Sequence, residues 1–173
     1  MWRHVHSTVD TLRPSEGALS TAELEAFVRD LMARPEAWAH LIAHDAERRR
    51  YELLLRDDRV EVWLICWMEN HDTGYHDHDL SGGAVGVVAG AVREDRLVLG
   101  RGTVSRIAAE GEAFTFTASD IHRVLHAGDA PAVTIHAYSP PLWRMGAYEI
   151  GADGELRRHS VSYADELRPL SAV

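Results

Sequence analysis

The region from Tyr51 onward constrains the fold most, because short apolar and β-branched runs alternate there with turn signals, and no helical pattern intervenes. Runs of strand length cover residues 51–55, 60–67, 75–78, 84–92, 96–100, 105–109, 113–118, 122–127, 132–139, 147–151 and 156–163. Breaks separate them at 57–58, 69–73, 82–83, 93–96, 110–112, 128–131 and 140–141. Short strands at this spacing, without crossover helices, are typical of a sandwich or a closed barrel. The sequence therefore predicts a mainly β protein.

A helical segment is predicted before the strands. Apolar residues recur with helical spacing at Leu24, Phe27, Val28, Leu31 and Met32. Ser20 and Glu23 have the spacing of a capping box, which predicts the start of the helix. Pro35 is expected to end or restart it, and residues 36–50 continue the pattern to an arginine run interpreted as a solvated helix end. We expect one domain over residues 1–173, with a helical segment at 1–50 and a β-barrel at 51–163.

Composition narrows the classes of function. The chain has 173 residues, 46% of them hydrophobic, which suits a single domain with a real core. Its 27 acidic and 18 basic residues give a net charge of −9, which disfavours nucleic acids and anionic membranes as partners. Cys66 is the single cysteine, so no disulfide framework exists. No signal core or long apolar run is present, and we expect a cytoplasmic protein.

The segment GYHDHDLSGG (74–83) holds two candidate metal ligands, His76 and His78. Residues two apart on a strand project to the same face, so both imidazoles can point into a barrel while Asp77 points away. Taken alone, His-x-His is a common pattern, and it more often marks two partly exposed polar residues near a turn than a metal site. A third histidine, His122, follows Gly111 by eleven residues.

The pair of histidines with a glycine near Gly90, followed by Gly111 and His122, resembles the two motifs of the cupin fold. The resemblance implies a cupin double-stranded β-helix, a jelly-roll-like barrel in which the histidines bind a divalent metal. Cupins usually add a glutamate shortly after the second histidine, but residues 79–83 contain none. A metal held by imidazoles alone suits substrates that bring an anionic donor such as a thiolate.

More specifically, HDHDLSGG followed by HRVLHAGDAPAVTIHAYSPPL resembles the cysteine dioxygenase family of thiol dioxygenases. The resemblance implies that Fe(II) is the cofactor and that its ligands are His76, His78 and His122. It also implies a catalytic hydrogen-bond relay formed by Thr134, His136 and Tyr138. These relay residues alternate on one strand, as a shared face requires.

The sequence departs from the family pattern at two places. Gly83 stands where mammalian members have a cysteine bonded to the relay tyrosine, so that crosslink is excluded. When Tyr51 is aligned with the tyrosine of the family's Tyr-x-Arg motif, Leu53 replaces the arginine that pairs with the substrate carboxylate. Other registers offer Arg49, Arg50 or Arg56, and a later segment offers Arg144. We take Arg50 and Arg144 as the candidate substrate-binding residues.

The resulting hypothesis is a non-haem Fe(II) thiol dioxygenase that oxidises L-cysteine to its sulfinic acid with dioxygen. One alternative is a dioxygenase for 3-mercaptopropionate or another small thiol. A second is a metal-binding cupin without turnover, and a third is a different cupin enzyme, which the missing glutamate disfavours. The expected partners are a small thiol and dioxygen, and the expected state is a monomer or weak homo-oligomer.

Overall fold

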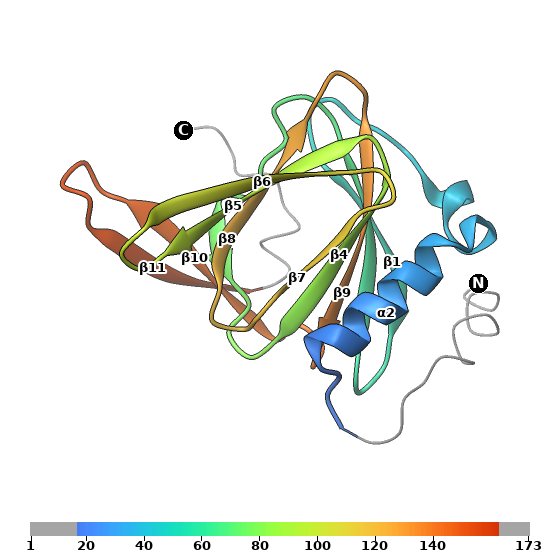
Figure 1. Ribbon diagram of the computed structural model, residues 1–173, viewed down its shortest axis with the longest axis horizontal. Helices are drawn as coiled ribbons and strands as arrows, with labels where there is room; N and C mark the ends of the chain where they lie inside the picture. Colours follow the sequence, from blue (N-terminus) through green and yellow to red (C-terminus); the bar gives the residue numbers. More distant parts are fainter. Residues whose placement is uncertain (1–16, 163–173) are drawn as a thin grey trace.

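Residues 17–162 are described by a computed structural model, in which one α-helix precedes a long series of strands (Figure 1). The helix is α2 (Thr21–Met32), and two short 3-10 helices follow at Pro35–Ala37 and Ala39–Leu41. The strands are β1 (Arg50–Arg56), β2 (Glu61–Trp67), β3 (Tyr75–Asp77), β4 (Gly82–Ala89), β5 (Ala91–Val98), β6 (Gly102–Ala109), β7 (Ala113–Phe116), β8 (Ile121–Ala127), β9 (Ala132–Ser139), β10 (Arg144–Ile150) and β11 (Leu156–Ser162). Residues 1–16 of the expected helical segment, and residue 163 of the last expected strand, lie outside the described residues.

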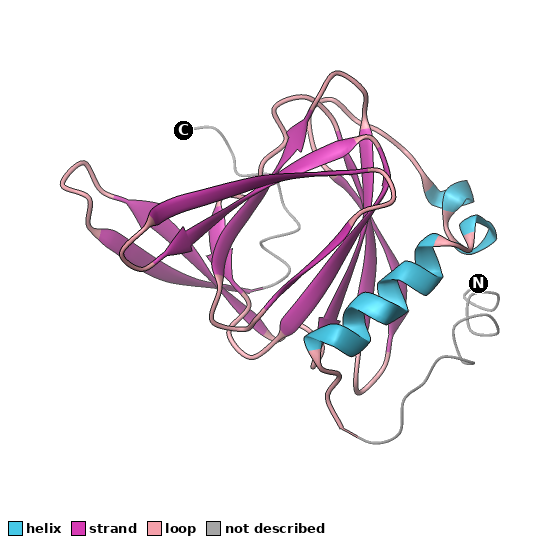
Figure 2. Ribbon diagram, viewed as in Figure 1, coloured by secondary structure: helices cyan, strands magenta, loops and turns pink. Residues whose placement is uncertain are grey.

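The strands form two antiparallel sheets, and the mainly β prediction is confirmed (Figure 2). The first sheet has the order β1-β2-β9-β4-β7 and the second the order β11-β10-β3-β8-β5-β6. One apolar cluster draws Val85 and Phe116 from the first sheet and Val92 and Val124 from the second, so this core lies between the sheets. Among the described strands no ladder joins the two sheets, so the structure is an open pair of sheets rather than a closed barrel.

Helix α2 covers the outer face of the first sheet (Figure 1). Its capping box forms as predicted, with the Ser20 side chain accepting from the backbone of Glu23 and Glu23 bonding back to Ser20. Leu24 and Val28 are fully buried against this sheet, and burial of each contributes roughly 1.5–3 kcal/mol. A Cβ on Gly86 would lie 2.5 Å from Cγ1 of Val28, so the close approach of helix to β4 requires glycine.

The predicted helix over residues 36–50 is wrong. The helical geometry ends at Leu41, Ile42 is extended, and Arg50 already begins β1. Trp38, which the helical pattern would place on an apolar face, instead donates its indole N–H to the carbonyl of Leu31, 2.9 Å away. The arginine run is therefore not a helix end, and the chain here is extended as it enters the first sheet.

The predicted break at residues 93–96 is also wrong, because β5 runs straight through these charged residues after a turn at Gly90. Glu94 and Asp95 are 3% and 4% exposed. Their charges are compensated, since Arg93 and Arg96 on the same strand pair with Asp95 and Glu94, and Arg106 on the neighbouring strand β6 also pairs with Glu94. Paired charges can be buried in a strand that composition alone would assign to a turn.

Asp77, between the two motif histidines, ties strand β3 to the hairpin of β10 and β11. Its carboxylate accepts from Nε of Arg158 at 2.8 Å, from the hydroxyl of Tyr148 at 2.5 Å and from the backbone N–H of Gly146 at 3.2 Å. Burial raises the pKa of Asp77, but these partners outweigh burial and bring the pKa to about 2. The carboxylate is therefore ionised and fixes the short strand that carries the histidines.

Candidate metal centre

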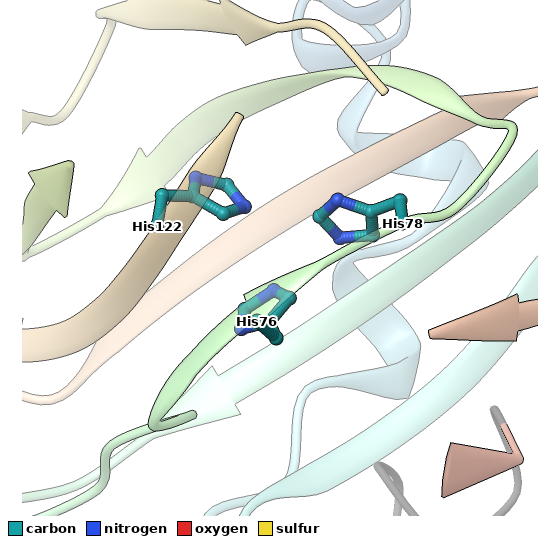
Figure 3. Close-up of side chains that lie close together, drawn as sticks. All are labelled: His76, His78 and His122. Atoms are coloured by element: carbon teal, nitrogen blue, oxygen red, sulfur yellow. The ribbon is translucent and has the colours of Figure 1, made fainter. Parts of the chain in front are cut away.

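Three histidines from two strands converge between the sheets (Figure 3). His76 lies on β3 and is the direct antiparallel partner of His122 on β8, so the two side chains share a face. His78 follows β3 and, two residues from His76, returns to the same side. One ring nitrogen from each lies within 4.8 Å of the others, and the three residues are 4%, 1% and 1% exposed. The structure thus brings together the three residues predicted as ligands.

The environment keeps the imidazoles of His78 and His122 neutral. Burial, followed by the neighbouring imidazoles, holds the pKa of His78 well below its usual range. Burial also lowers the pKa of His122 to about 4, although the hydrogen bond to Glu94 acts in the opposite direction. Neutral imidazole has a nitrogen lone pair that a metal can accept, whereas imidazolium has none. His78 and His122 are therefore ready to bind a cation at neutral pH.

The hydrogen bonds of His76 and His122 indicate which of their ring nitrogens are left for a metal. Nδ1 of His76 lies 2.9 Å from the carbonyl of Gly74, so the other nitrogen, Nε2, is left for a metal. Nδ1 of His122 is likewise engaged, and its Nε2 is buried without a hydrogen-bond partner, as is Nδ1 of His78. A buried polar atom without a partner is costly unless something unseen satisfies it. The residues therefore fit a bound divalent metal.

Glu94 is a component of this centre that the sequence analysis missed. Its Oε1 lies 2.7 Å from Nδ1 of His122, and both groups are buried. Burial raises the pKa of Glu94, but the hydrogen bond and charge of His122 and the contact with Arg96 outweigh burial and bring the pKa to about 2. The carboxylate therefore accepts the Nδ1 proton of His122 and holds the ring with Nε2 toward the other histidines.

The predicted relay residues are also hydrogen-bonded to one another on β9. Nδ1 of His136 lies 3.1 Å from the hydroxyl of Tyr138, and Nε2 lies 2.8 Å from Oγ1 of Thr134. Burial, followed by the nearby histidines, lowers the pKa of His136 to about 3, so this imidazole is neutral. This series of hydrogen bonds extends beyond the three predicted residues, because the indole N–H of Trp67 donates to Oγ1 of Thr134 at 2.8 Å. The Tyr138 ring lies 5.2 Å from the His78 ring.

Gly83 lies beside Tyr138, its partner across the ladder of β4 and β9. A Cβ on Gly83 would lie 2.1 Å from Cζ of Phe116, which is too close for two carbon atoms that are not bonded to each other. The Phe116 ring fills this space and stacks on His78 at 4.5 Å between ring centroids. Phe116 therefore requires glycine at position 83, and it supplies an apolar wall beside the histidines.

Among the described residues that line the cavity in front of the histidines, one is an arginine, and it is not one of the predicted two. Arg49 lines the cavity, together with Tyr51, Trp63, His136, Tyr138 and Met145 among others. Its guanidinium lies 5.5 Å from the ring centroid of Tyr51 and 5.4 Å from that of Trp67. Neighbouring residues in an extended chain point to opposite sides, which explains why Arg49 faces the cavity and Arg50 is exposed.

Arg144 lies at the surface as well. Its side chain is 52% exposed and forms an ion pair with Asp79, at 3.0 Å. Neither Arg50 nor Arg144 is among the residues that line the cavity, so the structure does not bring them to the candidate site. The cavity itself has a volume of about 30 Å³. A buried water needs roughly 10–15 Å³, so this space admits only a small molecule.

Comparisons with known proteins agree with the fold. A protein from Klebsiella pneumoniae, described as having a double-stranded β-helix domain, superimposes with a TM-score of 0.52 at 13% identity, over 59% of this chain and 80% of that one. A cupin superfamily protein from Desulfitobacterium hafniense superimposes with a TM-score of 0.50 at 14% identity, over 60% and 87% of the two chains. The predicted cupin fold is confirmed.

Sequence comparison identifies the family. The family described as cysteine dioxygenase type I matches residues 8–150. Cysteine dioxygenase type 1 from Homo sapiens is 23% identical over 141 residues, which cover 76% of this chain and 70% of the human protein. The Danio rerio protein of the same name is 26% identical over 139 residues, covering 72% and 68% of the two chains. The chain therefore belongs to the cysteine dioxygenase type I family of thiol dioxygenase enzymes.

Proposed function

We propose that this protein is a non-haem Fe(II) dioxygenase that converts a small thiol to its sulfinic acid with both atoms of dioxygen. L-cysteine is the leading substrate, and 3-mercaptopropionate is the nearest competitor. The observation that carries the proposal is the convergence of three buried histidines, with no carboxylate among the candidate ligand groups of the described residues. Three neutral donors leave a metal with positions for a thiolate and for dioxygen.

In this proposal His76, His78 and His122 hold the iron through their available ring nitrogens. Bound iron would lower the thiol pKa, accept the thiolate as a ligand and supply the redox chemistry with dioxygen. The protein contributes fixed ligand geometry and a nearly dry cavity. Phe116 excludes water beside His78, and Glu94 fixes the orientation of His122.

Tyr138 is proposed as the residue that acts on the reacting groups, with His136 and Thr134 as its positioning partners. The Trp67 indole can only donate, and it donates to Thr134. If the Thr134 hydroxyl then donates to Nε2 of His136, the proton of that ring lies on Nδ1 and points at the Tyr138 oxygen. The Tyr138 hydroxyl proton is then directed into the cavity, where it can stabilise developing negative charge on oxygen.

Arg49 is proposed as the partner of the substrate carboxylate, in place of Arg50 and Arg144. Its position against two aromatic rings restricts the guanidinium, and a restricted guanidinium loses less entropy when it binds a carboxylate. The small size of the cavity favours a small thiol over a peptide.

The remaining parts of the proposal concern the whole chain. Among the described residues no helix is long and apolar enough to cross a membrane. We propose that residues 1–173 form one cupin domain, acting in the cytoplasm as a monomer or weak homo-oligomer. The net charge of −9 gives no support for a nucleic-acid partner.

Oxygen consumption by the iron-loaded protein across a panel of small thiols, with the product identified, tests the proposal. Cysteine or 3-mercaptopropionate should be consumed with formation of the sulfinate. Arg49→Gln should raise KM for these carboxylate-bearing thiols and leave cysteamine, which has no carboxylate, unaffected. Arg50→Gln is the matched control and should behave as the wild type. Absence of oxygen uptake with every thiol would support a metal-binding cupin without turnover.

A further inference from the structure

We propose that Trp63, held in place by the buried carboxylate of Glu61, sets the upper size limit of the thiol that this site accepts. This inference rests on the proposed function, because it concerns the substrate side of the same cavity. Trp63 would act as a specificity-determining residue in contact with the substrate chain, and Glu61 as its positioning residue.

The sheet register places Trp63 at the cavity. On β2, Trp63 is the direct partner of His136 on β9, and Glu61 is the direct partner of Tyr138. Residues directly opposite each other in an antiparallel pair project to the same face, so Trp63 projects to the relay side of the sheet. Trp63 lines the cavity together with Ile65, two residues further along the strand.

The Trp63 ring is fixed by a specific hydrogen bond. Its indole N–H donates to Oε1 of Glu61 at 2.7 Å. Glu61 is fully buried, although it is a carboxylic acid. Burial of a carboxylate is costly without compensation, and the indole N–H of Trp63 supplies part of that compensation. The relay does not use Glu61, and no described contact joins it to the three histidines.

The partners of Glu61 restrict its movement. Nε of Arg56, at the edge of the molecule, lies 3.5 Å from Oε2 of Glu61. The backbone of Leu142 also stabilises its charged form, and Leu142 is itself part of the cavity lining. Glu61 thus connects two parts of the cavity wall, Trp63 on β2 and Leu142 after β9. The contacts of Glu61 with Trp63 and Leu142 therefore restrain this part of the cavity wall on the side away from the cavity.

The size of the cavity makes this wall decisive. The cavity has a volume of about 30 Å³ and Trp63 forms part of its wall, so an additional methylene group in a substrate brings the substrate chain closer to the indole. An apolar pocket discriminates one methylene group by roughly 10–200-fold. Because the indole is large and is hydrogen-bonded to Glu61, it cannot change rotamer to make room for a longer substrate as a flexible aliphatic side chain would. We therefore expect rejection of thiols that are one carbon longer than the substrate.

The experiment compares two matched pairs of thiols, cysteine with homocysteine and 3-mercaptopropionate with 4-mercaptobutyrate. Binding to the iron-loaded protein is measured by calorimetry without oxygen, and turnover is measured separately by oxygen uptake. The variants are Trp63→Leu and Trp63→Ala, with Trp143→Ala as the control, because Trp143 is 76% exposed and does not line the cavity. Thermal unfolding shows which variants are folded, and Trp63→Phe serves if the smaller residues unfold the protein.

Replacement of Trp63 by Leu or Ala should raise the affinity for the longer thiol, relative to the shorter one, by about 10-fold or more. Trp143→Ala should leave the ratio unchanged. Glu61→Gln keeps an acceptor for the indole N–H and should keep the wild-type ratio of affinities for the longer and the shorter thiol. Glu61→Leu removes that acceptor and should shift the ratio toward the longer thiol. A purely structural role for Glu61 would lower stability in both Glu61 variants and leave the ratio unaffected.

Failure of this inference can be distinguished from failure of the proposed function. If every folded Trp63 variant keeps the wild-type ratio while the short thiols are still oxidised, the size limit is not set by Trp63 and the inference is overturned. If the ratio shifts in the binding experiment but no variant consumes oxygen with any thiol, the inference stands and the dioxygenase proposal fails.

Discussion

Removal of the negative charge at position 94 should weaken metal binding without changing any ligand. Glu94→Gln keeps the size of the side chain and an oxygen that can accept from Nδ1 of His122, but it removes the charge. The amide nitrogen would then take the place of Oε2 and face Arg106, a cation that cannot accept a hydrogen bond. Glu94→Ala removes the acceptor as well and leaves the Nδ1 proton buried without a partner.

The magnitude follows from this geometry. The bond between Glu94 and His122 is short, 2.7 Å, and lies between groups that are 3% and 1% exposed, so solvent cannot replace it. Loss of such an outer carboxylate typically lowers metal affinity by about 10–100-fold, which corresponds to about 1.4–2.7 kcal/mol. We expect Glu94→Gln near the lower end of this range and Glu94→Ala near the upper end.

Competition with a chelator of known affinity measures the effect for Fe(II) without oxygen, and for Co(II), whose absorption spectrum also reports ligand geometry. Glu110→Gln is the control, because it removes the same charge from an exposed residue of the same region. Circular dichroism establishes that each variant is folded. Affinities of the two Glu94 variants within about twofold of the Glu110→Gln value would refute the idea that Glu94 orients His122, since the range expected for loss of such a carboxylate is larger.

Three further predictions concern residues around the cavity. Tyr138→Phe should lower kcat by about 10²-fold while thiol binding without oxygen is retained, and unchanged oxygen uptake would remove the hydroxyl from the mechanism. Gly83→Ala should cost about 1–3 kcal/mol in urea unfolding, because its Cβ would overlap Phe116, and Phe116→Leu should restore part of the loss. Burial raises the pKa of Glu61 above its unfolded value, so Glu61 contributes stability at low pH that is lost as pH rises through the folded pKa. Glu61→Gln should therefore gain stability relative to wild type as the pH rises above 4.5, the ordinary pKa of a glutamate, and a difference that stays constant with pH would contradict this.

The three histidines of the candidate metal site could be predicted from the sequence because the first two are placed by local geometry and their motif is specific. His76 and His78 share a face through the two-residue period of a strand, and this holds whatever the rest of the fold does. His122 is distant in sequence, and only the resemblance to a known family connected it with the pair. The structure supplies the physical link, because His122 is the antiparallel partner of His76.

Arg49 and Glu94 could not be placed from the sequence, for two different reasons. Arg49 and Arg50 are adjacent, so the choice between them depends on a register of one residue, and the predicted helix over this segment concealed the extended geometry. Glu94 lies in the charged run of residues 93–96, which composition assigns to a turn. Its burial depends on Arg106, which β6 brings alongside β5, and such long-range compensation of charge leaves no local pattern.

The position of Glu94 explains how a centre of three histidines can work without an anionic ligand. A carboxylate bound directly to the metal would occupy a coordination position and reduce the attraction for a thiolate. Glu94 acts instead through Nδ1 of His122, which makes that imidazole a stronger donor and leaves the position open. Its own charge is balanced on the outer side by Arg96 and Arg106, so the cavity side does not repel an incoming anion strongly. The site thus combines a fixed ligand set with an opening for a negatively charged substrate.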